Sequence, residues 1–100
     1  MVTEIAQFRA QPGQAEALQA GLVAGMAVIR RADGMRAITL RRCVEDPDVF
    51  IYEVEWETLE HHTVQFRGGP LFAEYRSHIT GLFVEPVSVN HYRTVPDSGM

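Results

Sequence analysis

The segment VFIYEVEW, residues 49–56, decides the fold. Its even-numbered residues are all apolar, whereas its odd-numbered residues include two glutamates. Because successive side chains of a strand point to opposite faces, this alternation predicts a β-strand with one apolar face. The turn signal Glu-Asp-Pro-Asp at 45–48 precedes it, and residues 35–44 (MRAITLRRCV) form the expected strand before that turn. The pattern therefore predicts an antiparallel hairpin.

Helices and further strands are expected on both sides of this hairpin. Residues 2–9 are predicted to be a strand, and residues 14–32 an Ala-rich helix with apolar residues at spacings of three and four. Two helices over 59–67 and 70–79 follow the hairpin, and residues 87–94 form the last strand. This β-α-β-β-α-α-β order is typical of a ferredoxin-like α+β fold, in which helices cover one face of a four-stranded antiparallel sheet.

The second face of such a sheet has no partner within the chain. It would leave apolar side chains such as Val49 and Ile51 in water, which is typical of an interface. A homodimer with two-fold symmetry is therefore expected. The 100 residues suffice for one domain over 1–95, with a flexible C-terminal tail over 96–100.

Composition and charge exclude several kinds of protein. The chain is 46% hydrophobic and 22% charged, and its net charge of −4 disfavours a nucleic-acid partner. The single cysteine, Cys43, allows neither an internal disulfide nor a Cys-rich zinc site. We see no signal-peptide pattern and no apolar stretch near the ~20 residues of a membrane span. The expected location is the cytoplasm, without membrane attachment.

Two further stretches carry a recognisable pattern. They are VEWETLEHHTVQFRGGPLFAEYRSHITGLF at 54–83 and VNHYRTV at 89–95. Together with Asp-Gly-Met at 33–35 and the turn at 45–48, they resemble the antibiotic biosynthesis monooxygenase (ABM) family, and the resemblance covers residues 2–95. It implies a dimeric α+β barrel with a pocket between sheet and helices in each subunit.

The resemblance also implies an oxidoreductase chemistry. Members acting on aromatic polyketides are cofactor-independent monooxygenases, so the expected substrates are O₂ and a planar aromatic or hydroquinone-type molecule. The substrate would lose a proton, pass an electron to O₂ and recombine with it, usually giving a quinone. Two alternatives stay open: a non-oxidative cyclase, isomerase or decarboxylase on the same scaffold, and a non-catalytic dimer that binds a small molecule.

Three residues at positions that match the family pattern are expected to be catalytic. Trp56 would stack on a planar substrate, or else anchor the sheet to a helix as a core residue. His62 would accept the phenolic proton, or else be a structural or surface histidine. Arg76 would stabilise a phenolate, or else be an exposed charge paired with Glu74 or Glu85.

Five more residues are expected to bind substrate: Tyr52, Phe66, Phe72, Tyr75 and His91. The hydroxyl of Tyr52 would orient a substrate oxygen or simply be satisfied within the core. The alternation leaves open whether His91 reaches the pocket or lies at the dimer seam. Arg67 is an alternative partner for a substrate anion.

No metal or cofactor is expected. The four histidines show no ligand spacing such as His-Glu-x-x-His. Heme is a less favoured alternative with His62 as the axial ligand. The resemblance places the heme-binding histidine of related proteins just after the position of Val64, where Gln65 and Phe66 stand here.

Overall fold

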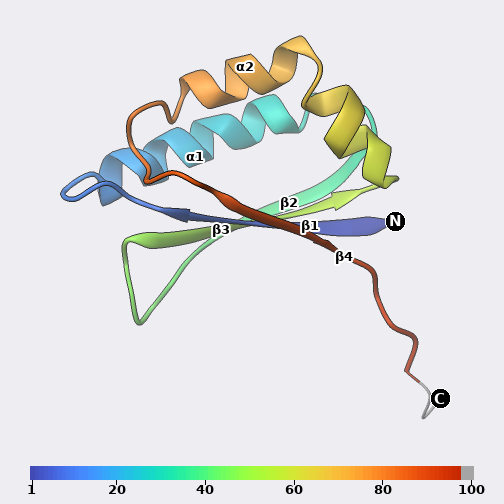
Figure 1. The fold of residues 1–100 in the computed structure, drawn as a ribbon, viewed down its shortest axis with the longest axis horizontal. Helices are drawn as coiled ribbons and strands as arrows, with labels where there is room; N and C mark the ends of the chain where they lie inside the picture. Colours follow the sequence, from blue (N-terminus) through green and yellow to red (C-terminus); the bar gives the residue numbers. More distant parts are fainter. Residues whose placement is uncertain (98–100) are drawn as a thin grey trace.

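A computed structural model describes residues 1–97, and within them it confirms the expected α+β order. The elements are β1 (Val2–Arg9), α1 (Ala15–Ile29), β2 (Met35–Arg42), β3 (Val49–Trp56), the π-helix η1 (His61–Phe66), α2 (Pro70–Ser77) and β4 (Ser88–Tyr92). The strands form one antiparallel sheet in the order β2-β3-β1-β4. Figure 1 shows the helices on one face of this sheet. This is the ferredoxin-like fold that the sequence predicted.

The largest differences from the predicted elements lie at helix ends. The helix expected over 14–32 ends at Ile29, with Arg30 as its C-cap, because the N–H groups of Arg31 and Ala32 donate to carbonyls only three residues back, at Val28 and Ile29. The helix expected over 59–67 is a π-helix over His61–Phe66, which is wider than an α-helix. The N–H of Arg67 donates to the carbonyl of His62, five residues back, at 3.1 Å. Such π-helical turns are rare and frequently occur at functional sites.

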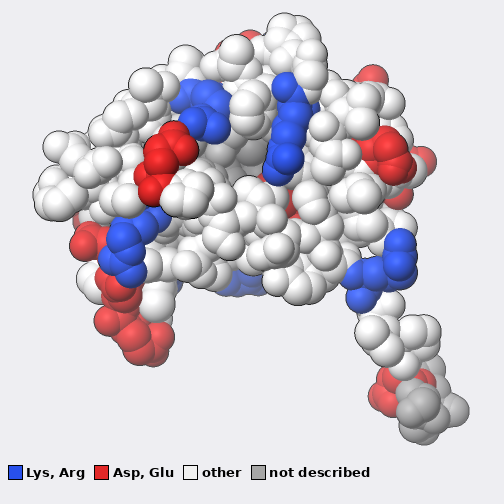
Figure 2. All heavy atoms as spheres, in the orientation of Figure 1, with Lys and Arg blue, Asp and Glu red and all other residues white. Residues whose placement is uncertain are grey.

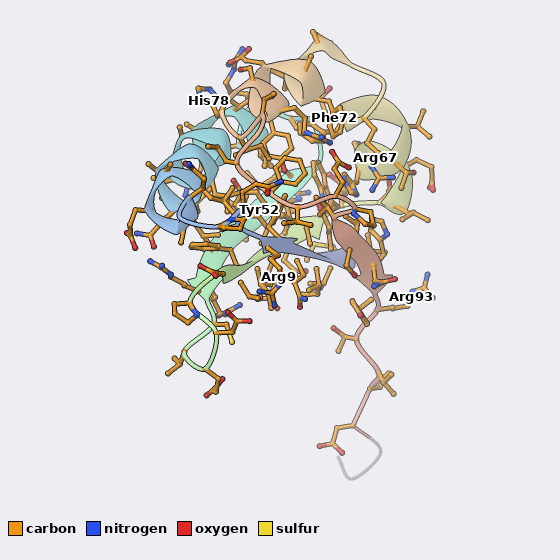
Figure 3. All side chains as sticks on the ribbon, turned by 60° about the vertical axis from the view of Figure 1, so that its left-hand side comes forward. Arg9, Tyr52, Arg67, Phe72, His78 and Arg93 are labelled. Atoms are coloured by element: carbon orange, nitrogen blue, oxygen red, sulfur yellow. The ribbon has the colours of Figure 1, made fainter. Side chains whose placement is uncertain are left out.

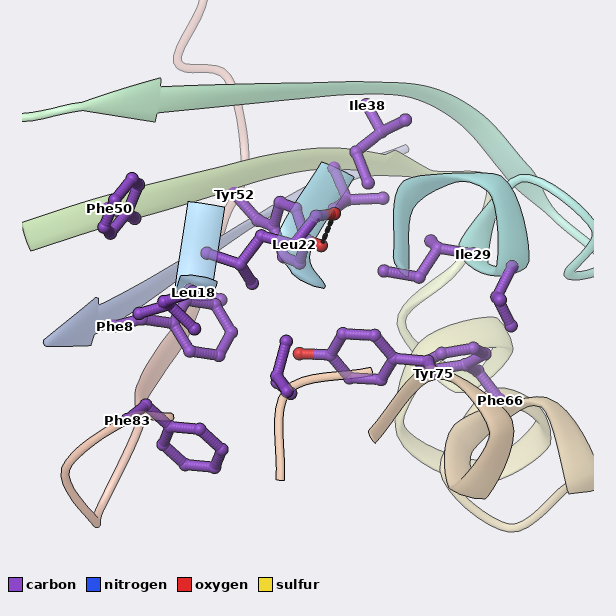
Figure 4. Close-up of a cluster of buried hydrophobic side chains, with 14 of the residues drawn as sticks. Phe8, Leu18, Leu22, Ile29, Ile38, Phe50, Tyr52, Phe66, Tyr75 and Phe83 are labelled. Carbon is purple, nitrogen blue, oxygen red and sulfur yellow. Dashed lines mark hydrogen bonds between the residues drawn. The ribbon is translucent and has the colours of Figure 1, made fainter. Parts of the chain in front are cut away.

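The core lies between the inner face of the sheet and the helices (Figure 4). The even-numbered residues of β3, from Phe50 to Trp56, are all buried there, as their alternation predicted. Helix α1 approaches α2 closely at Gly21, where a Cβ atom would lie 2.3 Å from the carbonyl oxygen of His78. At Gly25 a Cβ would lie 2.9 Å from the ring of Tyr75. Both glycines therefore set the distance between the two helices.

The outer face of the sheet carries no helix within residues 1–97 (Figure 1). Ile51 is half-buried on it, as expected for a strand centre. The expectation that Val49 is also left in water was wrong, because this residue is only 8% exposed. The 43–48 turn folds back on it: the N–H of Val49 donates to Asp46 and its carbonyl accepts from Cys43.

The chain ends beyond β4 in an extended segment. Pro96 and Asp97, the first residues of the predicted C-terminal tail, are exposed and have no regular secondary structure. Residues 98–100 of that tail lie outside the described residues. None of the helices within 1–97 is long and apolar enough to cross a membrane.

Candidate active site

A cavity of about 360 Å³ lies between the sheet and the helices. Seven of the eight predicted site residues line it, from β3, η1 and α2: Tyr52, Trp56, His62, Phe66, Phe72, Tyr75 and Arg76. Glu4 and Arg67 line it as well. Figure 3 shows Tyr52 on the sheet and Arg67 and Phe72 on the helical layer above it. The fold thus brings residues from distant parts of the sequence onto one cavity.

Trp56 forms a wall of the cavity and is fully buried. Its indole is stacked against the imidazole of His62, with ring centroids 5.1 Å apart and planes 14° apart. The ring of Phe66 lies on the same side, 5.6 Å from that of Trp56. Trp56 therefore anchors the sheet to η1, as the core interpretation expected, and it also lines the cavity, while its stacking on a substrate stays a prediction.

Glu4 is the site residue that the sequence analysis missed. The residue is only 7% exposed, and its Oε1 accepts a hydrogen bond of 2.9 Å from Trp56 Nε1. The same oxygen lies 3.4 Å from His62 Nε2. Burial raises the pKa of Glu4, and the bond from Trp56 and the charge of Arg67 offset this only in part. A signal was present, since Glu4 interrupts the apolar, inward-facing residues of β1.

His62 is held at both ring nitrogens. Nδ1 lies 2.7 Å from His91 Nε2, and Nε2 faces Glu4. Burial, together with the charge of Arg67 and the nearby His91, lowers the pKa of His62 to about 3. The ring is therefore neutral near pH 7. It offers no free nitrogen to a heme iron, so the arrangement does not fit the axial ligand considered above.

His91 faces the helical side of the sheet. It is opposite Glu4 in the pairing of β4 with β1, and it reaches η1 through its bond to His62. It is the predicted site residue that does not line the cavity. Burial, followed by the charge of Arg67, lowers its pKa. The side that alternation left open is thus the inner one.

Two arginines line the cavity beside its apolar walls. The guanidinium of Arg76 lies over the rings of Phe83 and Phe72, at 5.1 and 5.6 Å from their centroids. It also lies 3.5 Å from Glu85, in a partly exposed pair that contributes little to stability. Arg67 lines the cavity from the end of η1. Figure 2 shows basic side chains on either side of a hollow on this face.

The two cavity tyrosines differ in their hydrogen bonds. The hydroxyl of Tyr52 donates to the carbonyl of Leu22 in α1, so it is satisfied within the core (Figure 4). The hydroxyl of Tyr75 makes no hydrogen bond to another residue within 1–97, and because no fully buried side-chain oxygen there lacks a partner, this hydroxyl is accessible at the cavity that Tyr75 lines. Burial raises the pKa of both, so both stay protonated. Tyr75 is therefore the tyrosine with a donor to offer a ligand.

The chain matches a known family. The family model for antibiotic biosynthesis monooxygenases matches residues 1–77. The chain belongs to the ABM family. This membership confirms the resemblance seen in the sequence and supports a monooxygenase-type function in general.

Several individual proteins are similar over nearly the whole chain. The structure of a candidate ABM protein from Bordetella bronchiseptica has 34% identity and a TM-score of 0.89, covering 95% of this chain and 97% of that one. The uncharacterized protein YczJ of Bacillus subtilis (strain 168) is 27% identical over 95 residues, covering 95% of this chain and 100% of YczJ. SnoaB from Streptomyces nogalater, a cofactor-independent oxygenase, shares the fold at 14% identity and a TM-score of 0.82, covering 99% and 97%.

Metal ligation is not apparent in this ABM domain. Within residues 1–97, no three His, Cys, Asp or Glu side chains are grouped as metal ligands. Instead, the buried polar atoms of Glu4, Trp56, His62 and His91 bind one another. The arrangement combines an aromatic wall, buried proton-accepting groups and two guanidinium groups around one cavity. These groups can hold a planar ring, accept a proton and stabilise an oxyanion.

Proposed function

We propose that the protein is a cofactor-independent monooxygenase that oxidises a planar aromatic or hydroquinone-type substrate, of the polyketide kind, with O₂. The observation that carries this proposal is the convergence of Trp56, His62 and Arg76 on one cavity. Its volume of about 360 Å³ falls within the range of about 300–1,000 Å³ that is typical of small-molecule sites.

The apolar walls of the cavity would hold the substrate rings. Trp56 lines these walls with one face of its indole covered by the His62 ring, so a substrate would stack on the part that His62 leaves uncovered. Phe66 and Phe72 meet edge to face at a centroid distance of 5.7 Å. The free hydroxyl of Tyr75 would donate a hydrogen bond to a substrate oxygen. The Tyr52 hydroxyl, already bound to Leu22, would contribute its ring rather than its oxygen.

The reaction begins when the phenolic proton passes to the buried pair Glu4 and His62, which both line the cavity. The resulting phenolate is stabilised by the guanidinium groups of Arg76 and Arg67, which lie in a partly water-excluded site where charges interact more strongly than in bulk water. The electron-rich phenolate then passes an electron to O₂ and recombines with the reduced oxygen. One oxygen atom enters the product, usually a quinone, and the other leaves as water.

Two features support a reactive site over a non-catalytic binding dimer. A purely structural role would leave the interior filled, and a non-catalytic binding role would need no titratable side chain with a perturbed pKa at the cavity. Here the cavity is open, and burial lowers the pKa of His62 to about 3. Strongly shifted pKa values in a cleft are typical of functional sites.

We further propose a cytoplasmic homodimer. The uncovered face of the sheet supports this, because it carries Ile51 and the exposed ring of Tyr92, 54% accessible, with no helix of residues 1–97 upon it. A second copy would cover it face to face. Sedimentation or light scattering should give a mass near twice 11.2 kDa. A mass of one chain at micromolar concentration would contradict this part of the proposal.

The activity is tested with chelator-treated protein and a panel of anthrones and hydroquinones. We expect O₂ uptake and, with ¹⁸O₂, a product that carries one labelled oxygen. Arg36→Ala is a suitable control variant, because Arg36 is paired with Glu57 on the surface and does not line the cavity. Turnover with no added oxygen would instead indicate a cyclase, isomerase or decarboxylase.

A further inference from the structure

Three titratable side chains form a continuous line from the cavity toward the sheet edge. Glu4 lies on β1, His62 on η1 and His91 on β4, the edge strand. Glu4 Oε1 is 3.4 Å from His62 Nε2, and His62 Nδ1 is 2.7 Å from His91 Nε2. Buried polar groups that form such a network hold one another in a fixed geometry.

We propose that Glu4 is the group that takes the substrate's proton, and that His62 and His91 are positioning residues that hold its carboxylate toward the cavity. This inference rests on the monooxygenase function proposed above and names the base within it. It assigns a catalytic role to a residue of the first strand.

The geometry of the carboxylate favours this role. Oε1 is occupied by Trp56 Nε1 and faces His62. Oε2 makes no hydrogen bond to another residue in the described part of the chain. Because every fully buried side-chain oxygen of residues 1–97 has a partner, Oε2 is accessible, and Glu4 lines the cavity. Oε2 is therefore the oxygen that a substrate hydroxyl can reach.

His62 itself is poorly suited to be the direct acceptor. Both of its ring nitrogens already face partners, and its ring is stacked on Trp56. Its pKa of about 3 means that the ring binds a proton weakly at neutral pH. The raised pKa of Glu4 has the opposite effect, since a carboxylate whose pKa is raised by burial binds a proton more strongly than an ordinary one.

The proton transfer balances within the site. The O–H bond of the substrate breaks, a new O–H bond forms at Glu4 Oε2, and the electron pair stays on the substrate oxygen as a phenolate. After the phenolate has reacted with O₂ to form a peroxide on a ring carbon, Glu4 returns this proton to the outer peroxide oxygen. The O–O bond then breaks as the oxygenated carbon loses its own hydrogen, so that the inner oxygen stays as the new carbonyl and the outer oxygen leaves with both protons as water. The carboxylate is thereby restored, and no external acid is consumed.

The surroundings of Glu4 determine its pH response. The titratable or charged side chains around Glu4 and its cavity are Tyr52, His62, Arg67, Tyr75, Arg76, Glu85 and His91. Both tyrosines and both histidines are neutral near pH 7, so the charges are those of Arg67 and of the Arg76–Glu85 pair. Glu85 is exposed and paired with Arg76, whereas Glu4 is buried against His62, so we assign the acid limb of the activity profile to Glu4.

The decisive variant is Glu4→Gln, which keeps an oxygen that can accept from Trp56 Nε1. We expect kcat to fall by about 10²–10⁴-fold, the usual contribution of a general base, while KM changes little. The acid limb of the kcat/KM profile should disappear. Glu16→Gln is the matched control, because Glu16 is on the surface and pairs with Arg42.

Substrate acidity provides an independent test. A substrate whose hydroxyl is already ionised at the assay pH needs no base, so Glu4→Gln should oxidise it at a rate close to that of the wild type. His91→Phe removes the support of His62, and should shift the acid limb while leaving KM nearly unchanged. Wild-type-like turnover by a folded Glu4→Gln protein, or an equal loss with the pre-ionised substrate, would overturn the role of Glu4. Absence of O₂ uptake by the wild type would overturn the proposed function itself.

Discussion

The imidazole of His62 is stacked on the indole of Trp56, and the same indole donates its N–H to Glu4. One side chain at the end of β3 therefore fixes the orientation of two titratable groups from η1 and β1. Stacked aromatic pairs contribute about 0.5–1.5 kcal/mol beyond the burial of their surfaces. The aromatic wall of the cavity and its proton-accepting groups are thus a single packed unit.

Replacing Trp56 should disturb this unit as a whole. Trp56→Phe keeps a ring but removes the donor to the buried carboxylate of Glu4. Because an unsatisfied buried polar group costs about 1–3 kcal/mol, we expect the free energy of unfolding to fall by that amount. Urea unfolding followed by circular dichroism measures it. An unchanged midpoint would show that the hydrogen bond to Glu4 contributes nothing.

The two tyrosines of the cavity form a matched pair. Tyr52→Phe removes a buried hydrogen bond to Leu22 and should lower the free energy of unfolding by about 0.5–1.5 kcal/mol. Tyr75→Phe removes a hydroxyl without a partner in the described chain, so stability should hardly change while substrate affinity falls. Thermal unfolding and ligand titration separate the two effects. A loss of stability in Tyr75→Phe together with a loss of affinity in Tyr52→Phe would contradict these roles.

The arginines should act on the affinity for substrate anions. Arg76→Ala and Arg67→Ala are each expected to weaken binding of a phenolate about tenfold, corresponding to about 1.4 kcal/mol. The chain has a single tryptophan, Trp56, so quenching of its fluorescence can report binding directly. Arg36→Ala should leave the affinity unchanged. If all three variants bound the phenolate equally well, its oxygen would not lie beside Arg76 or Arg67.

Acid should destabilise the fold through His62. Between about pH 6.5 and 3 the unfolded chain binds a proton at this residue and the folded chain does not, so stability falls as the pH falls. The slope for one such proton is about 1.4 kcal/mol per pH unit. His91 contributes with the same sign. The raised pKa of Glu4 contributes with the opposite sign, adding stability below its folded pKa that is lost as the pH rises through it.

His62→Gln isolates this contribution. The variant should be less stable than the wild type at pH 7, and its stability should change less between pH 6.5 and 4. Thermal unfolding across this range, with Arg67, Glu4 and His91 all intact, gives the comparison. Parallel curves for the two proteins would show that His62 is not buried as a neutral ring.

The sequence predicted the sheet better than the site, for a physical reason. The alternation in 49–56 is a local property of one strand, and it directly gives the buried face that carries Tyr52 and Trp56. The positions of Glu4 and His91 depend on strand register and on the π-helix that crosses above them. In β4 the polar His91 lies on one face and the apolar ring of Tyr92 on the other, so alternation could not assign the side of His91.

The sequence also could not predict that two residues both line the cavity and contact groups outside it. Arg76 was expected either in the cavity or in a surface pair, and it lies in the cavity while it contacts Glu85. Tyr52 lines the cavity while its hydroxyl belongs to the core. Side chains at the boundary between a pocket and its surroundings can serve both, and only the packed structure shows this.

The most direct test of the central claim is O₂ uptake by the purified protein, free of metal, flavin and heme, with an anthrone or hydroquinone substrate under ¹⁸O₂. The account predicts uptake that depends on Trp56, His62 and Arg76, with one labelled oxygen in each product molecule. Substrate that binds and quenches Trp56 without any O₂ uptake, or a product without the label, would contradict it.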